Sequence, residues 1–131
     1  MENLHQLVAR LITSFLPAAL RNHTIFINEV PVELPVEHNN EWVASIITGM
    51  ITIAATNTTN NCILFSAKQY GHVIVLEMQE FNKIPLNTDL RQIQRLAEKI
   101  GGSLSITVQN PEKSSMLFSF PNLPVVAWAG Q

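Results

Sequence analysis

The sequence has 131 residues, of which 47% are apolar or aromatic and 14% are charged. This length and composition are typical of one folded domain and exclude a disordered chain. The formal net charge of -2 provides no basic surface for binding nucleic acid. Asp89 is the single aspartate, which excludes mechanisms that need two aspartates or an Asp-rich metal site.

The sequence also predicts a cellular setting. Cys62 is the one cysteine, so a single chain can form neither a disulfide framework nor a thiolate zinc site. His5, Gln6 and Arg10 interrupt the apolar stretch 4–20, and no window reaches the ~18 apolar residues of a membrane span. We therefore expect a cytoplasmic protein with no membrane span. Its initiating Met and its length suggest that the chain stands alone.

Two elements are predicted before residue 37. Apolar residues recur at steps of three and four, which predicts an amphipathic helix over 4–16 that Pro17 limits and a last turn at 20–21 completes. The stretch 24–30 is rich in β-branched residues and stops at Pro31, so it is predicted as a strand. The segment 33–36, between two prolines, is at most a short edge strand. The apolar stripe of the helix is Leu4, Leu7, Val8, Leu11, Ile12, Phe15 and Leu16.

The middle of the chain predicts a buried helix followed by a hairpin. Asn39 or Asn40 can cap a helix that begins near Glu41 and presents a broad apolar face as far as Ala54. The polar run 56–61 is predicted as a surface connection. Two β-rich segments, 63–67 and 72–78, then predict strands joined by a turn at 68–71.

The last third repeats this arrangement with another helix and another hairpin. A helix over 90–100 is expected to start at Asn87, Thr88 or Asp89 and to end at Gly101-Gly102. Strands 103–109 and 115–120 follow, joined by residues 110–113. The order of elements predicts an α+β two-layer sandwich in which helices cover one face of a mixed, mostly antiparallel sheet.

We divide the chain into an N-terminal amphipathic helix (1–22), a central domain (23–121) and a C-terminal tail (122–131). The tail carries Val125, Val126 and Trp128, and these side chains are expected to dock on the body or to meet a partner.

From Leu4 to Pro121 the order of elements resembles the ATP-binding domain of sensor histidine kinases, a histidine-kinase-like ATPase of the Bergerat or GHKL type. The run 93–106 (IQRLAEKIGGSLSI) resembles that family's last helix, Gly-Gly turn and following strand. The run 110–121 (NPEKSSMLFSFP) resembles its Pro-containing turn and final Phe-x-Phe strand ending in proline. These are scaffold signatures, so they imply the fold rather than the activity.

The resemblance also assigns the positions that bind nucleotide in the family. Thr48 and Thr52 stand where the family has an Asn-x-x-x-Asn pair facing the phosphates and Mg²⁺. A helical threonine hydroxyl often bonds to the carbonyl one turn earlier, so ordinary packing is favoured over a ligand pair.

The family's Asp-x-Gly-x-Gly, which contacts adenine, is also replaced. The retained Ile84-Pro85 sets a register in which Gln79 replaces the aspartate, and Phe81 and Lys83 replace the two glycines. Gln79 retains an amide oxygen that accepts one hydrogen bond. Phe81 would place a ring near the base, which favours a filled pocket.

The family's phosphate lid is missing. Only Leu86 separates Pro85 from the next helix start, and Asp89 places a negative charge where a polyphosphate would lie. Asp89 is therefore interpreted as a helix cap. The resemblance thus assigns six positions of this sequence to the family's nucleotide-binding site. They are Thr48, Thr52, Gln79, Phe81, Lys83 and Asp89.

These replacements predict a bacterial pseudokinase, which is a degenerate histidine-kinase-type ATPase domain that docks proteins in two-component signalling with weak or no ATP turnover. The alternative is a divergent histidine kinase domain that still binds ATP and supports phosphotransfer. A third hypothesis is a small α+β domain that binds a different ligand in the relic pocket.

We assign no catalytic residue and no metal ligand, and we expect no cofactor unless the alternative brings ATP and Mg²⁺. His5, considered as a phospho-accepting histidine, is interpreted instead as an exposed terminal residue. The expected partners are a response regulator or a kinase, with a homodimer formed through the 4–16 helix.

Overall fold

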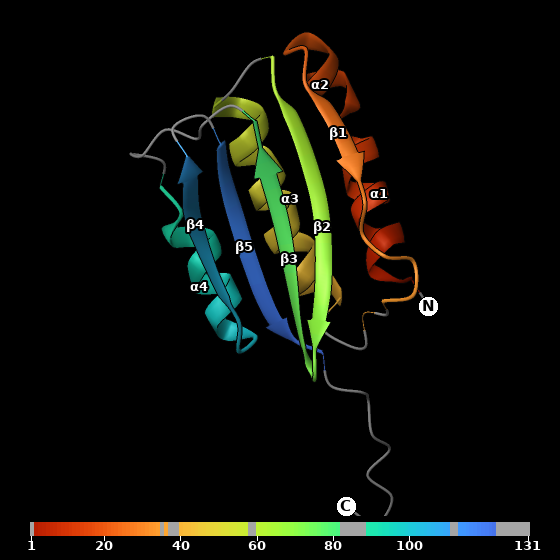
Figure 1. Cartoon of the computed structure of the whole chain (residues 1–131), viewed down its shortest axis with the longest axis vertical. Helices are drawn as coiled ribbons and strands as arrows, with labels where there is room; N and C mark the ends of the chain where they lie inside the picture. The colour runs from red at the N-terminus through yellow and green to blue at the C-terminus, as the bar shows by residue number, and fades with distance from the viewer. Residues whose placement is uncertain are drawn as a thin grey trace, which may run out of the picture.

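The computed structural model describes residues 2–34, 36, 40–57, 60–81, 89–110 and 113–122. Within these residues the chain forms four helices and five strands (Figure 1). They are α1 (Leu4–Ser14), α2 (Leu16–Arg21), β1 (Ile25–Asn28), α3 (Asn40–Asn57), β2 (Cys62–Tyr70), β3 (Val73–Glu80), α4 (Arg91–Lys99), β4 (Ser103–Asn110) and β5 (Lys113–Pro121).

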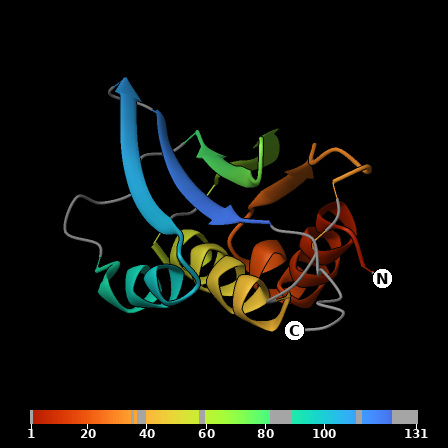
Figure 2. The ribbon, with the colours of Figure 1, turned by 90° about the horizontal axis from the view of Figure 1, so that it is seen from below.

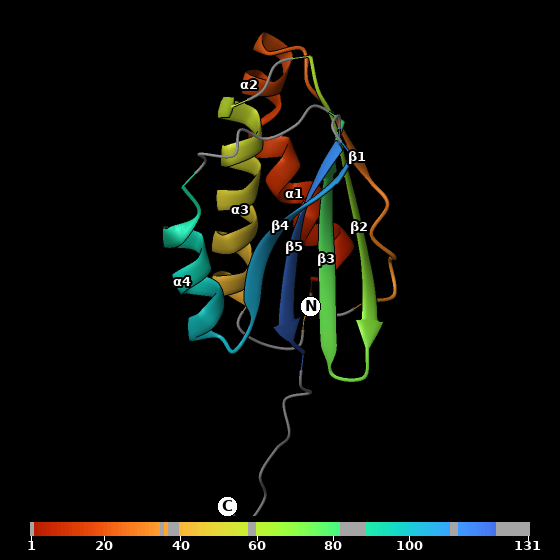
Figure 3. The same cartoon turned by 60° about the vertical axis from the view of Figure 1, so that its left-hand side comes forward.

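The strands form one sheet in the order β1-β2-β3-β5-β4. Strand β1 runs parallel to β2, and the other neighbours are antiparallel. Figures 2 and 3 show the helices as a single layer on one face of this sheet. The predicted α+β two-layer sandwich with a mixed, mostly antiparallel sheet is therefore confirmed.

Strand β3, near the middle of the sheet, shows how the sequence separates the two faces. Ile74, Leu76 and Met78 are fully buried, whereas the residues between them are partly exposed. Successive side chains of a strand point to opposite faces, so this alternation places the even-numbered residues toward the helices. Glu80 continues the same series.

Helix α1 is anchored at its start by a reciprocal cap. The Asn3 side chain accepts from the backbone N-H of Gln6 at 2.8 Å, and the Asn3 N-H donates to Gln6 Oε1 at 3.0 Å. The apolar stripe packs into the same core as α3 and the sheet, with Leu4, Leu7 and Val8 fully buried. The predicted single helix is divided at Phe15, and Pro17 lies in the first turn of α2.

Four predicted boundaries need correction. The second hairpin turn is shorter than 110–113, because Asn110 and Lys113 pair with each other at the ends of β4 and β5. The first strand is shorter than 24–30, because only 25–28 pair with β2. The hairpin turn is at Gly71 and His72 rather than at 68–71, since β2 and β3 stay paired as far as Tyr70 and Val73. Gly71 supplies the positive φ of 62° that this tight turn requires. The polar run 56–61 is not wholly a surface connection, because α3 extends to Asn57 and Asn61 is buried.

The Gly101-Gly102 turn fixes the end of α4 against the sheet, as the sequence predicts. Gly101 has a φ of 82°, and the Gly102 N-H donates to the Ala97 carbonyl at 2.8 Å. A Cβ atom at Gly102 would collide with the backbone carbonyl oxygen of Ser119. The tail beyond residue 122 lies outside the described residues.

Candidate functional site

Glu80, the last residue of β3, is a carboxylic acid with no exposed surface. Its Oε1 atom accepts a long hydrogen bond from Asn61 Nδ2 at 3.5 Å. Its Oε2 atom has no hydrogen-bond partner among the described residues. Burial raises the pKa of Glu80 to about 8, because a charged carboxylate loses its hydration there. At neutral pH the neutral acid therefore predominates.

The surroundings of Glu80 are polar, unlike the rest of the helix-facing core. Ser114 lies opposite Glu80 in β5 and is fully buried. Asn61, 3% exposed, accepts a backbone hydrogen bond from Ile25 at 2.9 Å. Polar groups that are this deeply buried are costly unless they are hydrogen-bonded, and functional sites are a common place for the exceptions. This end of the sheet is therefore a candidate ligand site.

Gln79 does not share this environment. It is partly exposed and pairs with Leu64 and Ser115 on the face that the helices leave uncovered. The retained Ile84-Pro85 places Gln79 at the adenine-contacting position, but the strand alternation places Glu80 on the helix side instead. The buried series Ile74, Leu76 and Met78 was the sequence signal that would have identified Glu80.

Phe81 is not enclosed in the interior. Its side chain is 38% exposed, and Lys113 Nζ lies 5.0 Å from the centre of its ring. The structure therefore pairs the ring with a cation at the surface. Lys83 lies outside the described residues.

Thr48 and Thr52 lie one turn apart on α3, as the resemblance requires. The Thr52 hydroxyl donates to the Thr48 carbonyl at 2.7 Å, and Thr56 repeats this contact with Thr52. A hydroxyl that donates to its own helix has its single proton in use. Between the two threonines, Gly49 approaches Ile93 of α4 so closely that a Cβ atom would overlap its side chain.

Asp89 precedes α4 and is fully engaged by Arg91. Its Oδ1 atom accepts from the Arg91 backbone N-H at 3.0 Å and from Nε at 3.1 Å, and its Oδ2 atom accepts from Nη2 at 3.0 Å. These hydrogen bonds, led by those of the Arg91 side chain, lower the pKa of Asp89 to about 2. Asp89 therefore lies just before Leu90, the N-cap residue of α4, as an ionised group that accepts from the first helical N-H.

The groups available for Mg²⁺ and phosphate do not form a binding set. Thr52 and Asp89 already satisfy hydrogen bonds within the chain. Among the described residues no group of three or more His, Cys, Asp or Glu side chains is placed to hold a metal ion. Thr52 and Asp89 are thus engaged within the chain, whereas Glu80 Oε2 has no hydrogen-bond partner among the described residues. None of the described helices is long and apolar enough to cross a membrane.

A mixed five-stranded sheet with helices on one face, ending in a Gly-Gly turn and an antiparallel strand pair, is the fold of the catalytic ATP-binding domains of histidine kinases. The chain has this fold, which confirms the resemblance at the level of structure. No family model matches the sequence, and no curated protein matches it.

Solved structures of histidine kinases match it closely in three dimensions. The Acinetobacter baumannii histidine kinase AdeS superposes with a TM-score of 0.80 at 12% identity, over 92% of this chain and 65% of that one. The catalytic domain of histidine kinase ThkA gives 0.75 at 14% identity, over 93% of this chain and 95% of that one. ThkA in complex with the response regulator TrrA gives 0.77 at 15% identity, over 93% of this chain and 41% of that one. The chain thus spans less than two thirds of some of the kinases that it matches.

Proposed function

We propose that this chain is a degenerate histidine-kinase-type ATPase domain that acts as a docking or regulatory module in two-component signalling, with weak or no ATP turnover. The observation that carries the proposal is the Asp89–Arg91 cluster at the start of α4. A polyphosphate at this helix end would have to displace Asp89, which already occupies the Arg91 backbone N-H and the Arg91 guanidinium. The engaged hydroxyl of Thr52 supports the same conclusion.

The Glu80 environment favours a second candidate, in which the domain still binds ATP or another adenine nucleotide. A neutral carboxylic acid offers one donor and one acceptor side by side. The edge of adenine that carries N6 and N7 offers the complementary acceptor and donor. Glu80 Oε2 has no partner among the described residues, so a base would satisfy a buried group that is otherwise unpaired.

Calorimetric titration of the purified protein with Mg-ATP separates the two candidates. The proposed function predicts no binding up to millimolar nucleotide. Micromolar binding that Glu80→Gln weakens at least tenfold, with Glu77→Gln on the uncovered face as a matched control, would establish the second candidate instead. A titration with Mg-ADP, which lacks the γ-phosphate, then shows whether binding depends on the base or on the phosphates.

The proposed partner is a response regulator or another kinase, by analogy with ThkA, whose structure was solved in complex with the response regulator TrrA. A homodimer through residues 4–16 would use the exposed side of α1, because Leu4, Leu7 and Val8 already pack inside the chain. Light scattering over a range of concentrations tests the homodimer. The cytoplasmic location stays a prediction from the sequence.

A further inference from the structure

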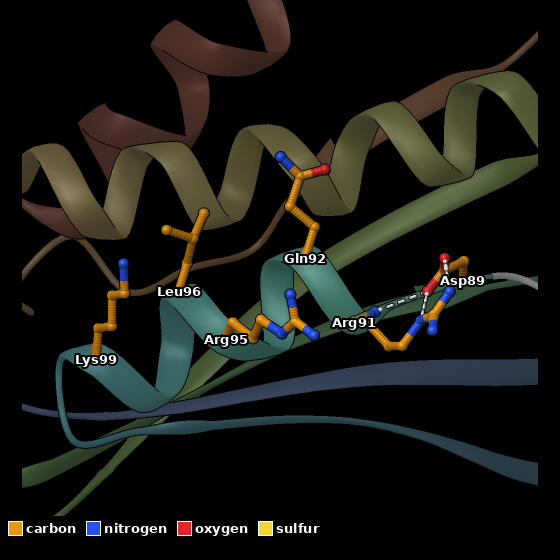
Figure 4. Close-up of a pocket in the computed structure, with 6 residues that line it drawn as sticks. All are labelled: Asp89, Arg91, Gln92, Arg95, Leu96 and Lys99. Carbon is orange, nitrogen blue, oxygen red and sulfur yellow. Dashed lines mark hydrogen bonds and ion pairs between the residues drawn. The ribbon is translucent and has the colours of Figure 1, made fainter.

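Helix α4 borders an open hollow of about 630 Å³ on the side that does not pack into the core. Ile93 and Ala97 bury the core-facing side of the helix. Figure 4 shows Gln92, Leu96 and Lys99 projecting from α4 toward α3, and Arg91 turned back onto Asp89. The residues that line it are Asp89, Arg91, Gln92, Arg95, Leu96 and Lys99.

The hollow continues toward the start of α3. A smaller hollow of about 270 Å³ is lined by Glu41, Trp42, Ser45 and the same Leu96. Trp42 is 43% exposed, and Lys99 Nζ lies 5.8 Å from the centre of its ring. The two adjoining hollows share Leu96, and Lys99 of the larger one lies over the Trp42 ring of the smaller one, so together they form a groove that offers two apolar side chains and a cation. We call it the α3–α4 groove.

Positive charge is concentrated in this groove. The chain has eight Lys and Arg residues in all, and three of them line the larger hollow. Arg91 is paired with Asp89. Neither Arg95 nor Lys99 forms an ion pair within the described residues. Lys99 lies over the Trp42 ring. Among the described residues that line the two hollows, the acids are Asp89 and Glu41 and the bases are Arg91, Arg95 and Lys99, so this lining carries a net positive charge.

The spacing of the cations indicates the shape of a complementary partner. Arg91, Arg95 and Lys99 follow one another at four-residue steps, so they recur about every 6 Å along the axis of α4. A partner helix with acidic residues at the same steps presents carboxylates with the same repeat. Apolar residues beside them would meet Leu96 and Trp42, as in other complexes in which an amphipathic helix lies in a groove.

We propose that the α3–α4 groove binds an acidic amphipathic helix of a partner protein. This inference rests on the proposed docking function and names the surface and the chemistry of the partner. The apolar floor supplies affinity, whereas Arg95 and Lys99 select acidic over basic partners and set the register. The Asp89–Arg91 pair lies at one end of the groove, where a carboxylate of the partner competes with Asp89 for Arg91.

A sole-tryptophan protein tests the groove directly. In a Trp128→Phe background, Trp42 fluorescence reports occupancy of the groove. The probe is a designed 18-residue helical peptide with Glu at i, i+4 and i+8 and Leu at the neighbouring groove-facing positions. The control peptide has Lys in place of each Glu. We expect saturable binding of the acidic peptide that is at least tenfold tighter than binding of the basic peptide and that weakens as NaCl rises from 50 to 500 mM.

Charge-reversal variants locate the binding. Arg95→Glu combined with Lys99→Glu should weaken binding of the acidic peptide at least tenfold, whereas Arg21→Glu on the exposed side of α2 should change it less than twofold. Asp89→Asn keeps the Oδ1 acceptor but frees the Arg91 guanidinium, so it should tighten binding twofold to fivefold. Circular dichroism of each variant checks that the fold is retained.

Three results would overturn the groove proposal. They are the absence of saturable binding at millimolar peptide, equal binding of the acidic and basic peptides, or equal losses in the Arg21 variant and the Arg95/Lys99 variant. None of them bears on Mg-ATP binding. Conversely, tight binding of Mg-ATP would contradict the proposed function while leaving the peptide result as it stands, so the two failures are distinguishable.

Discussion

Glu80 and Asp89 are two carboxyl groups nine residues apart in environments of opposite character. Glu80 has no exposed surface and one long hydrogen bond, and burial raises its pKa to about 8. Asp89 is exposed and accepts three hydrogen bonds from Arg91, which lower its pKa to about 2. The Glu80 end of the sheet therefore holds a neutral group whose Oε2 atom has no partner among the described residues, whereas the start of α4 holds a carboxylate that is already hydrogen-bonded.

This difference determines how each carboxyl group would respond to a ligand. An unpartnered buried group gains free energy when a ligand supplies its missing hydrogen bond. A carboxylate that is already bonded to an arginine gains little from a ligand, because its hydrogen bonds are made within the chain. The Glu80 end thus keeps a buried polar atom without a partner among the described residues, whereas the carboxylate before α4 is already hydrogen-bonded.

The largest expected effect on stability comes from disturbing the close contact between Gly102, after α4, and β5. This contact holds α4, which follows Asp89, against the sheet. Gly102→Ala would place a Cβ atom against the Ser119 carbonyl oxygen, so β4 and β5 must separate locally or α4 must shift. We expect a loss of about 3 kcal/mol or more in the free energy of unfolding, as for other substitutions that overpack a rigid site. Urea denaturation measures it.

Gly71→Ala is the matched control for that substitution. Gly71 also has a positive φ, but nothing lies within 4 Å of an added Cβ atom. Its cost should be limited to the backbone strain of about 1–2 kcal/mol. Equal losses in the two variants would show that the Gly102 contact does not fix α4.

The pH dependence of stability sharpens the comparison at Glu80. With a folded pKa of about 8 and an ordinary value of 4.5, the folded state binds the Glu80 proton more tightly than the unfolded state does. Stability from this group is therefore fully present below pH 4.5 and is lost as pH rises through 8. Glu80→Gln cannot ionise, so its stability does not fall in this way. At pH 7 its free energy of unfolding should exceed that of the wild type by about 3 kcal/mol, and at pH 4.5 the two should be equal.

Urea denaturation at pH 4.5, 7 and 8.5 measures this difference. Glu77→Gln, on the uncovered face of the same strand, serves as the control and should stay within about 0.5 kcal/mol of the wild type. A Glu80→Gln variant that is no more stable than the wild type at pH 7 would mean that Glu80 is ionised and solvated in the folded protein.

The smallest expected effect is at Asp89. Asp89→Ala removes the acceptor of the Arg91 backbone N-H together with the exposed ion pair, so the first turn of α4 loses one hydrogen bond. We expect Tm to fall by roughly 2 °C or less, and the fall should shrink in 1 M NaCl because salt screens the ionic part. The stabilising contribution of the charge disappears as pH falls through 2.

An unchanged Tm for Asp89→Ala, with an unchanged helix content, would show that this hydrogen bond is dispensable. Asp89→Asn should fall between Asp89→Ala and the wild type, because its side-chain oxygen still accepts from Arg91 N.

Much of the fold follows from local patterns in the sequence. The buried stripe of α1 and the alternation along β3 each report which side faces the core, and the Gly-Gly turn marks the end of α4. Strand ends were harder to predict, because polar residues such as Lys68 and Gln69 are held in β2 by pairing with β3 rather than by their own propensity. Tertiary pairing decides such boundaries.

The candidate site was less accessible from the sequence. Thr52 bonds back to its own helix, as the tendency of helical threonines predicts. Ile84-Pro85 sets a register that selects Gln79, whereas the buried alternation of β3 that includes Met78 selects Glu80. The Asp89–Arg91 cluster needs both side chains to fold back on one helix end, which residue types alone do not determine.

The central claim is that Glu80 is a sealed, neutral acid in a domain that does not bind Mg-ATP. Carboxyl ¹³C NMR of Glu80, recorded from pH 5 to 9 with and without 5 mM Mg-ATP, tests both parts in one experiment. The structure predicts a midpoint near pH 8 that nucleotide does not move. A Glu80 carboxylate that is ionised at pH 7, or a resonance that shifts when Mg-ATP is added, would contradict it.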